Sequence, residues 1–275
     1  MQKIIESIPN FSVSSQRDPE TFDKLVNTAG PTLKSTQSDG DHNRCVFTLI
    51  GEPEKVGEAI FNLATCAAEN IDLRHHTGEH PRIGATDVIP FVPIKDATMD
   101  ECIDLSIYTA KRISSELNIP TFLYEYSTPE RRNLADIRLG KYAKPDFGPD
   151  QPHPTAGATV VGARKFLIAY NVNLDTDNIH LAKKIASLIR EKNGGYPGIK
   201  ALGMKVNGRA QVSMNICDFE ATGVREIFDV IAKLAPVKNS ELIGMAPAAT
   251  NIEADAEHLK LADFDPQKQI IDYQI

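Results

Sequence analysis

The alternation of hydrophobic and polar positions is clearest in the second half of the chain. Short apolar runs and apolar residues at helical spacing follow one another there, which predicts a strand, a helix, two strands, a helix and a strand. Asn207-Gly208 lies between the two middle strands and is typical of a tight β-hairpin. The order β-α-β-β-α-β is typical of a ferredoxin-like fold. The six elements are expected at residues 166–174, 179–189, 200–206, 210–217, 224–234 and 240–245.

The first half begins with the same order and continues with one more helix and one more strand. Its clearest element is a helix that begins at Pro53, because Val56, Ile60 and Leu63 share one face. We therefore expect an extended β-α-β-β-α-β unit. Its elements are expected at residues 3–8, 19–28, 32–36, 44–50, 53–69, 87–94, 98–117 and 121–126.

A segment rich in proline and glycine, residues 139–157, separates the two halves and cannot be a central strand or an uninterrupted helix. A long segment of this kind inside a compact chain usually has a function or is disordered. The chain is thus expected to be an α+β protein with two ferredoxin-like α/β-sandwich subdomains, residues 1–165 and 166–275. Two such subdomains would leave a cleft between them, where small molecules commonly bind.

Composition narrows the class of protein. The 275 residues include 41% hydrophobic and 24% charged residues, which are ordinary values for a globular protein. Thirty basic residues against 37 acidic ones give a net charge of −7, which argues against non-specific nucleic-acid binding. The four cysteines form no CxxC pair, so disulfides and structural zinc are not expected. No apolar run is long enough for a secretion signal or a bilayer span, and we expect a cytoplasmic protein with no membrane partner.

The candidate chemistry lies in the loop RHHTGEHPRIGATD, residues 74–87. Its stretch from His76 to His80 matches HxxEH, in which a helix of a zinc hydrolase presents two histidines one turn apart. Gly78 weakens a helix, and Pro81 disfavours helical geometry at the residue before it. Without a helix, the spacing no longer brings both rings to one ion. We therefore expect no metal here.

Among the histidines of this loop, His80 is the candidate for proton transfer, because imidazole titrates near neutral pH and this ring lies in a restrained turn. His75 and His76 are expected to be solvated, as are the arginines of a short helix near residues 131–138. Residues 157–164 have the glycine spacing of a P-loop but lack its lysine–hydroxyl pair, so we do not expect a nucleotide site.

Five unusual segments occur in a fixed order along the chain. They are Ile8-Pro-Asn-Phe-Ser12, Asn43-Arg44, Gly78-Glu-His-Pro-Arg-Ile-Gly-Ala85 with Asp87, Pro145-Asp-Phe-Gly-Pro149 and Gly157-Ala-Thr-Val-Val-Gly-Ala-Arg-Lys-Phe-Leu-Ile-Ala169. Taken together, they resemble the glutamate formiminotransferase family, the folate-dependent enzymes of histidine degradation, in which these segments have the same order. The resemblance covers roughly residues 3–218 and thins toward the C-terminus, and we expect no cyclodeaminase domain.

The resemblance implies transfer of a formimino group from N-formimino-L-glutamate to N5 of tetrahydrofolate, which is a co-substrate. It implies that His80 is the catalytic base and acid, and that a nearby aspartate assists it. Asp39 is the favoured equivalent and Asp41 the alternative, because the loop length differs there. The folate-binding stretch maps onto Gly148, Pro149, Asp150, Gln151, Pro152, His153, Pro154, Thr155, Ala156 and Gly157.

Three further residues, Arg82, Arg132 and Lys165, are candidates to bind the carboxylates of folate and glutamate, because cations pair with carboxylates and arginine offers a bidentate fork. The partners expected are these small molecules and a second copy of the chain in a homodimer. Three alternatives stay open. They are a formyltransferase acting on 5-formyltetrahydrofolate or N-formylglutamate, a zinc hydrolase that uses HxxEH, and a folate-binding module without activity.

Overall fold

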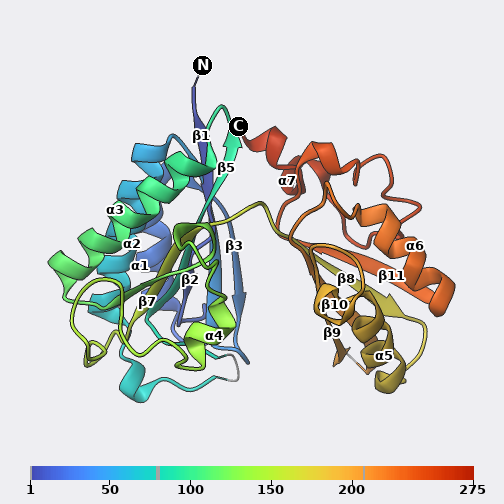
Figure 1. Cartoon of the computed structure of the whole chain (residues 1–275), viewed down its shortest axis with the longest axis horizontal. Helices are drawn as coiled ribbons and strands as arrows, with labels where there is room; N and C mark the ends of the chain where they lie inside the picture. The colour runs from blue at the N-terminus through green and yellow to red at the C-terminus, as the bar shows by residue number, and fades with distance from the viewer. Residues whose placement is uncertain (1, 79–80, 207) are drawn as a thin grey trace. The chain divides into compact units, whose positions relative to one another are not determined.

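The computed structural model describes residues 2–78, 81–206 and 208–275 of the chain. They form two compact units, Met1–Arg164 and Lys165–Ile275. Each unit has its own β-sheet and its own hydrophobic core, and each combines helices with strands (Figure 1). The chain is therefore an α+β protein. Within the described ranges, no helix is both long enough and apolar enough to cross a bilayer.

The sheet of the first unit has seven strands, and β4 and β5 are its long central members. Between them lie β1 and β2, one after the other, and both of these pair with β4 and with β5. Pro9 separates the two short strands because proline has no N–H to donate to a neighbouring strand. The seven strands are β1 (Ile4–Ser7), β2 (Asn10–Phe11), β3 (Leu33–Asp39), β4 (Arg44–Gly51), β5 (Thr86–Lys95), β6 (Thr121–Leu123) and β7 (Thr159–Ala163).

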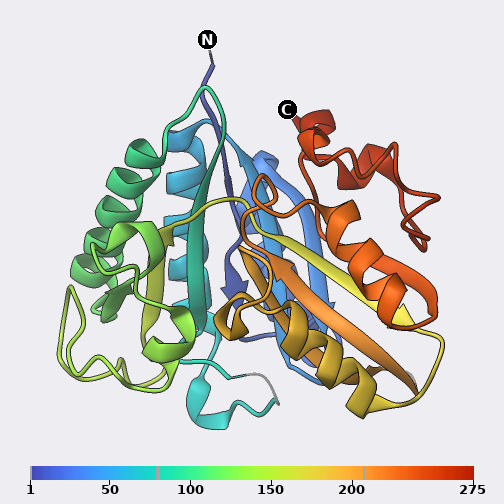
Figure 2. The same cartoon turned by 45° about the vertical axis from the view of Figure 1, so that its right-hand side comes forward.

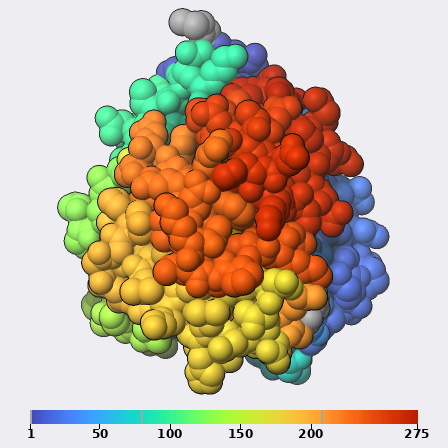
Figure 3. Space-filling model, turned by 90° about the vertical axis from the view of Figure 1, so that its right-hand side faces the viewer, coloured from blue at the N-terminus to red at the C-terminus, as the bar shows by residue number. Residues whose placement is uncertain are grey.

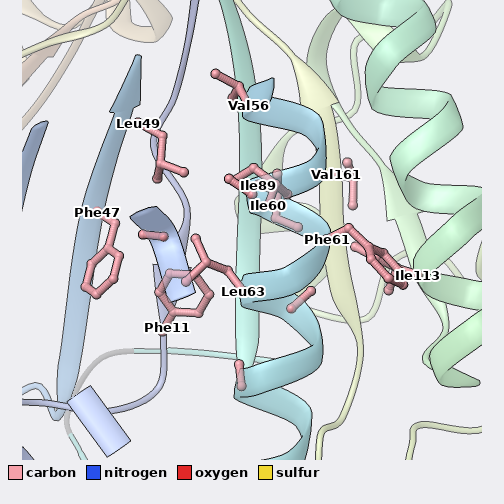
Figure 4. Packing of buried hydrophobic residues seen from close by; sticks show 14 of the residues in the cluster. Phe11, Phe47, Leu49, Val56, Ile60, Phe61, Leu63, Ile89, Ile113 and Val161 are labelled. Carbon is pink, nitrogen blue, oxygen red and sulfur yellow. The ribbon is translucent and has the colours of Figure 1, made fainter. Parts of the chain in front are cut away.

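Three long helices, α1 (Pro19–Ala29), α2 (Pro53–Asn70) and α3 (Met99–Leu117), pack on this sheet to form the main core (Figure 1). In Figure 4, Leu63 of α2 lies beside Phe11, and Phe61 on the other side of the same helix points toward Ile113 of α3. A capping box starts α3, because Thr98 Oγ1 accepts from Glu101 N (3.2 Å) and the Glu101 carboxylate accepts from Thr98 N (2.9 Å).

A second, smaller cluster contains Val88, Tyr124, Ile137 and Val160. Ile137 belongs to the short helix α4 (Leu134–Arg138) and is 4% exposed, so the cluster anchors that helix to the unit. α4 thereby acquires a fixed position despite having only five residues.

The strand β7 is an element of the first unit that the hydrophobic pattern misses. It runs parallel to both β5 and β6. All five of its residues are buried, so the period-two alternation of a half-exposed strand is absent. The strand expected at 121–126 is also shorter than its pattern suggests, because β6 ends at Leu123 and a 3-10 turn, Glu125–Ser127, follows.

The second unit has four antiparallel strands in the order β11-β8-β10-β9 and two helices that share one core with them (Figure 2). In chain order the elements are β8 (Ile168–Leu174), α5 (Ile179–Ile189), β9 (Ile199–Val206), β10 (Arg209–Ile216), α6 (Val224–Leu234) and β11 (Val237–Ile243). The residues of β8 alternate between buried and half-buried, because the helices cover one face of the sheet. The order of elements agrees with the pattern read from the sequence.

After β11 the chain continues into a C-terminal segment that contains the short helix α7 (Pro266–Gln269). On the surface of the second unit this segment lies against α6 (Figure 3). His258 Nε2 is 2.6 Å from Asp229 Oδ1, and Arg225 donates to Asp255 (2.5 Å). The remaining helical turns of the chain are the 3-10 helices Gly30–Thr32, Leu73–His75, Glu191–Asn193, Ala248–Thr250 and Ile271–Gln274.

Candidate active site

Three segments of the first unit that are far apart in sequence meet at one place. They are the β3–β4 hairpin at residues 39–44, the loop at residues 73–85 and the stretch at residues 153–158. The loop is hydrogen-bonded to the hairpin on one side and to the 153–158 stretch on the other. Each segment includes residues that the family resemblance singles out.

Side chains fasten the loop to the hairpin on both sides of its tip. Thr77 O accepts from Asn43 Nδ2 (3.0 Å) and from Arg17 Nη1 (3.1 Å). Arg82 Nη1 donates to Asn43 O (2.8 Å), and its Nη2 donates to His42 O (2.6 Å). The residues just before and just after the loop tip are thus held by the same hairpin.

Backbone bonds join the loop to the 153–158 stretch. Ala85 N donates to Ala156 O (2.9 Å), and Ala158 N donates to Ile83 O (2.8 Å). Gly84 has to be glycine here, because a Cβ at this position would lie 1.9 Å from Ala158 O. Gly157 combines a φ of +70° with a Cβ position only 2.2 Å from Ile83 O, so it too excludes a side chain.

The predicted catalytic residue, His80, lies outside the described residues, as does Glu79 of the HxxEH pattern. The flanking residues Gly78 and Pro81 are described. A Cβ at Gly78 would lie 2.4 Å from His42 O, so a side chain there would push the loop off the hairpin. The role assigned to His80 stays a prediction.

His76 differs from the sequence-based expectation. It was expected to be a solvated loop histidine, but its ring is part-buried, with Nε2 2.8 Å from Arg82 Nη1 and 3.2 Å from Asn43 O. Burial, followed by the nearby charge of Arg82, lowers the pKa of His76. Its backbone is extended (φ −85°, ψ 133°), so no helix presents this ring in the manner of an HxxEH site. Across the described part of the chain, no three His, Cys, Asp or Glu side chains gather as metal ligands would.

The two candidate aspartates lie at the end of the hairpin. Asp39 is the last residue of β3 and is exposed, and its Oδ1 accepts from His42 N (2.8 Å). That bond closes the turn that also presents the His42 carbonyl to Arg82. Asp41 is exposed within the same turn. The choice between the two aspartates as a partner of the histidine stays a prediction.

The stretch predicted to bind folate changes from exposed to buried along its length. Gly148 begins it with a φ of +93°, and its Cβ position is 2.1 Å from Ser114 Oγ. The middle residues are largely exposed, while Ala156 and Gly157 are buried against the loop. His153 closes the final turn, because its Nδ1 accepts from Ala156 N (3.1 Å) and its backbone bonds twice to Gly157.

The three predicted carboxylate-binding cations all have protein partners. Arg82 bonds to the hairpin as described above. Arg132 donates from Nη1 to both oxygens of Asp146 (2.9 and 2.8 Å) and from Nε to Glu130 (2.5 Å). Lys165, in the second unit, donates to Asp218 (2.7 Å), and this bond lowers the pKa of Asp218. Their role in binding substrate stays a prediction.

Sequence reasoning missed a buried ion-pair cluster beside the loop. Asp87 is 1% exposed, and its Oδ2 accepts from both Arg44 Nη1 (3.0 Å) and Arg138 Nη2, while its Oδ1 accepts from Ile83 N (2.8 Å). Arg44 also donates twice to Asn10 Oδ1 (2.9 and 2.7 Å). Burial lowers the pKa of Arg44 to about 10.

The prediction that the arginines near residues 131–138 are solvated is wrong for Arg138 and Arg132. Their side chains are 15% and 19% exposed. Arg138 pairs with the buried Asp87, which lies 51 positions earlier in the chain. Arg132 pairs with the half-buried Asp146, which lies on a segment beyond α4. The sequence signal for the pair of Arg138 and Asp87 is that Asp87 is one of the residues that carry the family resemblance.

Comparison with known proteins relates this geometry to a family. Residues 4–164 match the family described as "Formiminotransferase domain, N-terminal subdomain", and residues 169–260 match "Formiminotransferase domain". The chain belongs to the formiminotransferase domain family. The family resemblance inferred from the sequence is therefore confirmed.

Relatives in this formiminotransferase family include proteins of nearly the same length. A "Glutamate formimidoyltransferase" of Streptococcus pyogenes serotype M1 is 48% identical, over 99% of this chain and 98% of its own. A protein of the same name from Thermoplasma acidophilum is 38% identical, over 95% of this chain and 94% of its own. The "Formimidoyltransferase-cyclodeaminase" of Rattus norvegicus is 34% identical over the whole of this chain, which spans 60% of that protein.

Proposed function

We propose that the protein is a glutamate formimidoyltransferase, which moves the formimino group of N-formimino-L-glutamate to N5 of tetrahydrofolate. The observation that carries this proposal is the full-length similarity to a relative of that name, 48% identical over 99% of this chain. The meeting of the hairpin, the loop and the 153–158 stretch supports it, because hydrogen bonds join three segments of the first unit that include residues of the family resemblance. Tetrahydrofolate is then a co-substrate and the pathway is histidine degradation. No disulfide joins the four cysteines, all of which the structure describes, and this suits the reducing cytoplasm that we propose.

The proposed chemistry needs one group that accepts and then returns a proton. N5 of the pterin attacks the formimino carbon and forms a C–N bond, and His80 takes the proton that N5 loses. When the tetrahedral intermediate collapses, the bond between that carbon and the glutamate nitrogen breaks, and His80 gives the proton to this nitrogen. The products are 5-formiminotetrahydrofolate and glutamate, and the enzyme returns to its starting state.

The surrounding residues have supporting roles in this proposal. Asp39 orients the imidazole of His80, and residues 148–157 bind the folate. Arg82, Arg132 and Lys165 remain candidates for contacts with carboxylates. Much of the acceleration comes from holding two small substrates together, because effective molarities of well-placed partners reach about 10⁵–10⁸ M. We also propose that both units are ferredoxin-like subdomains and that they coincide with residues 1–165 and 166–275. For the second unit this is supported by its β-α-β-β-α-β order.

The test mixes purified protein with tetrahydrofolate and N-formimino-L-glutamate and follows the absorbance of the formimino product. We expect turnover by the wild type and a decrease in kcat of about 10²- to 10⁴-fold for His80→Ala, with a smaller change in KM. His75→Ala is the matched control, because this exposed neighbour has no role in the proposal. Normal turnover by His80→Ala would remove that residue from the mechanism, and absence of turnover by the wild type would refute the proposed function.

A further inference from the structure

The guanidinium of Arg138 is held next to the loop but is only partly used by the protein. Arg138 is the last residue of α4, and Ile137 beside it is buried in the second cluster of the first unit. Among the residues that the structure describes, Asp87 is its one side-chain hydrogen-bond partner, through Nη2. Arginine has five N–H donors, so most of those on Arg138 are not used in this bond.

A second feature of Arg138 is that other positive charges lie near it. Arg44 and Arg138 share the single carboxylate of Asp87. Arg82 is close enough for the charge of Arg138 to lower the pKa of Arg82, although burial is the larger cause. Burial is also the largest cause of the lowered pKa of Arg44; Asp87 opposes it, and the charges of Arg138 and Arg82 lower this pKa further. Two cations thus bond to one described carboxylate beside the loop, and a third, Arg82, is near enough for its charge to act on them.

Joining β4 to the loop does not by itself require Arg138 in addition to Arg44. Arg44 has the Asn10 side chain and Asp87 as partners, and Asp87 holds Ile83 N with its other oxygen. The pair of Arg44 and Asp87 would therefore fix the start of β4 to the loop without a second guanidinium. Arg138 adds a cation whose buried Nε has no hydrogen-bond partner among the residues that the structure describes, which is unfavourable. An anionic ligand would offset the repulsion and use the remaining donors.

We propose that Arg138 binds the α-carboxylate of N-formimino-L-glutamate, with Asp87 and Arg44 as positioning residues that aim its guanidinium. This inference rests on the proposed function and names a substrate contact for the same site. Asp87 orients Arg138 through one oxygen and the loop through the other, so the cation and the loop that carries His80 share one anchor.

The covalent structures of the two substrates favour the formimino donor, rather than folate, as the ligand of Arg138. In N-formimino-L-glutamate the nitrogen that leaves is bonded to the carbon that carries the α-carboxylate. A cation that binds this carboxylate must therefore lie beside the group that protonates the nitrogen. Ile83, whose N–H bonds to Asp87, follows His80 by three residues in the sequence. The carboxylates of folate belong to its glutamyl tail, and the p-aminobenzoyl group separates them from N5.

The experiment measures substrate discrimination. The wild type, Arg138→Met and the control Arg112→Gln are assayed with N-formimino-L-glutamate and with two analogues, in which the α- or the γ-carboxylate is replaced by a carboxamide. Arg112 lies on α3 and pairs with Glu58 and Glu116, outside the site. The measured quantity is the ratio of kcat/KM for the acid to kcat/KM for each amide. This ratio does not depend on how much of a variant is folded.

We expect the wild type to prefer the acid over the α-amide about 10- to 100-fold, which is the range for hydrogen bonds to a charged group. Arg138→Met should bring this ratio close to one, raise the KM for the formimino donor and change the KM for tetrahydrofolate less than twofold. Arg138→Lys, which keeps the charge without the fork, should give an intermediate ratio. Arg112→Gln should behave as the wild type.

Other outcomes overturn the inference. An α-amide ratio in Arg138→Met that equals the wild-type ratio excludes contact with this carboxylate. Loss of discrimination against the γ-amide alone, or an effect on tetrahydrofolate alone, assigns the residue to a different carboxylate. The proposed function fails in a different way, namely when the wild type itself forms no formiminotetrahydrofolate, so the two failures are distinguishable.

Discussion

Replacing Glu6 by glutamine should change how the stability of the first unit depends on pH. Glu6 lies on β1, opposite Ile50 and Val92 of the neighbouring strands, and is 3% exposed. Burial raises its pKa from 4.5 to about 7, and the charge of Arg164 opposes this increase. The difference between 4.5 and about 7 corresponds to about 3 kcal/mol of unfolding free energy.

The direction of this pH dependence follows from the number of protons that Glu6 binds in the folded and unfolded states. Between pH 4.5 and about 7 the folded protein keeps a proton on Glu6 that the unfolded chain has released, so stability decreases as pH rises through this window. Below pH 4.5 the contribution of Glu6 to the unfolding free energy is fully present, and above about pH 7 it is lost. Glu6→Gln cannot ionise, so it should match the wild type near pH 4 and be more stable by about 3 kcal/mol at pH 8.

The assay is urea unfolding at a series of pH values, followed by circular dichroism. Hydrogen-exchange mass spectrometry of the peptide that contains β1 assigns the change to the first unit. Glu69→Gln is the control, because Glu69 is an exposed glutamate on α2 of the same unit. If Glu6→Gln and the wild type lose stability equally between pH 5 and pH 8, the reasoning about Glu6 is refuted.

Two further predictions concern the candidate site. Gly84→Ala should lower the unfolding free energy by about 1–3 kcal/mol and reduce formiminotransferase activity, because the new Cβ would lie 1.9 Å from Ala158 O. A melting temperature and an activity equal to those of the wild type would show that the loop tolerates this contact. Activity should survive exhaustive treatment with EDTA, since the proposed chemistry uses no metal. Loss of activity on chelation that zinc restores would instead favour the HxxEH interpretation.

Much of the architecture is local information, and the sequence alone determined it. In the second unit, apolar residues at helical spacing and the Asn207-Gly208 dipeptide predict the observed order of elements, because each element there has one covered face. In the first unit, the helix that begins at Pro53 follows from the same rule. The glycines of the loop could be noted from sequence, but their reason could not. For Gly84 that reason is the carbonyl of Ala158, 74 positions later in the chain, and for Gly78 it is the carbonyl of His42.

What the tertiary structure decided depends on partners that are distant in sequence. The strand β7 is buried on both faces, so its residues show no alternation, and only pairing with β5 and β6 makes it a strand. His76 and Arg138 have the composition of solvated loop residues. They are part-buried because Asn43 and Asp87 lie where the folded sheet brings them, and a hydrogen bond across 33 or 51 positions leaves no local pattern. A sequence shows which side chains a site has available, whereas their charges and contacts are fixed by the segments that fold against them.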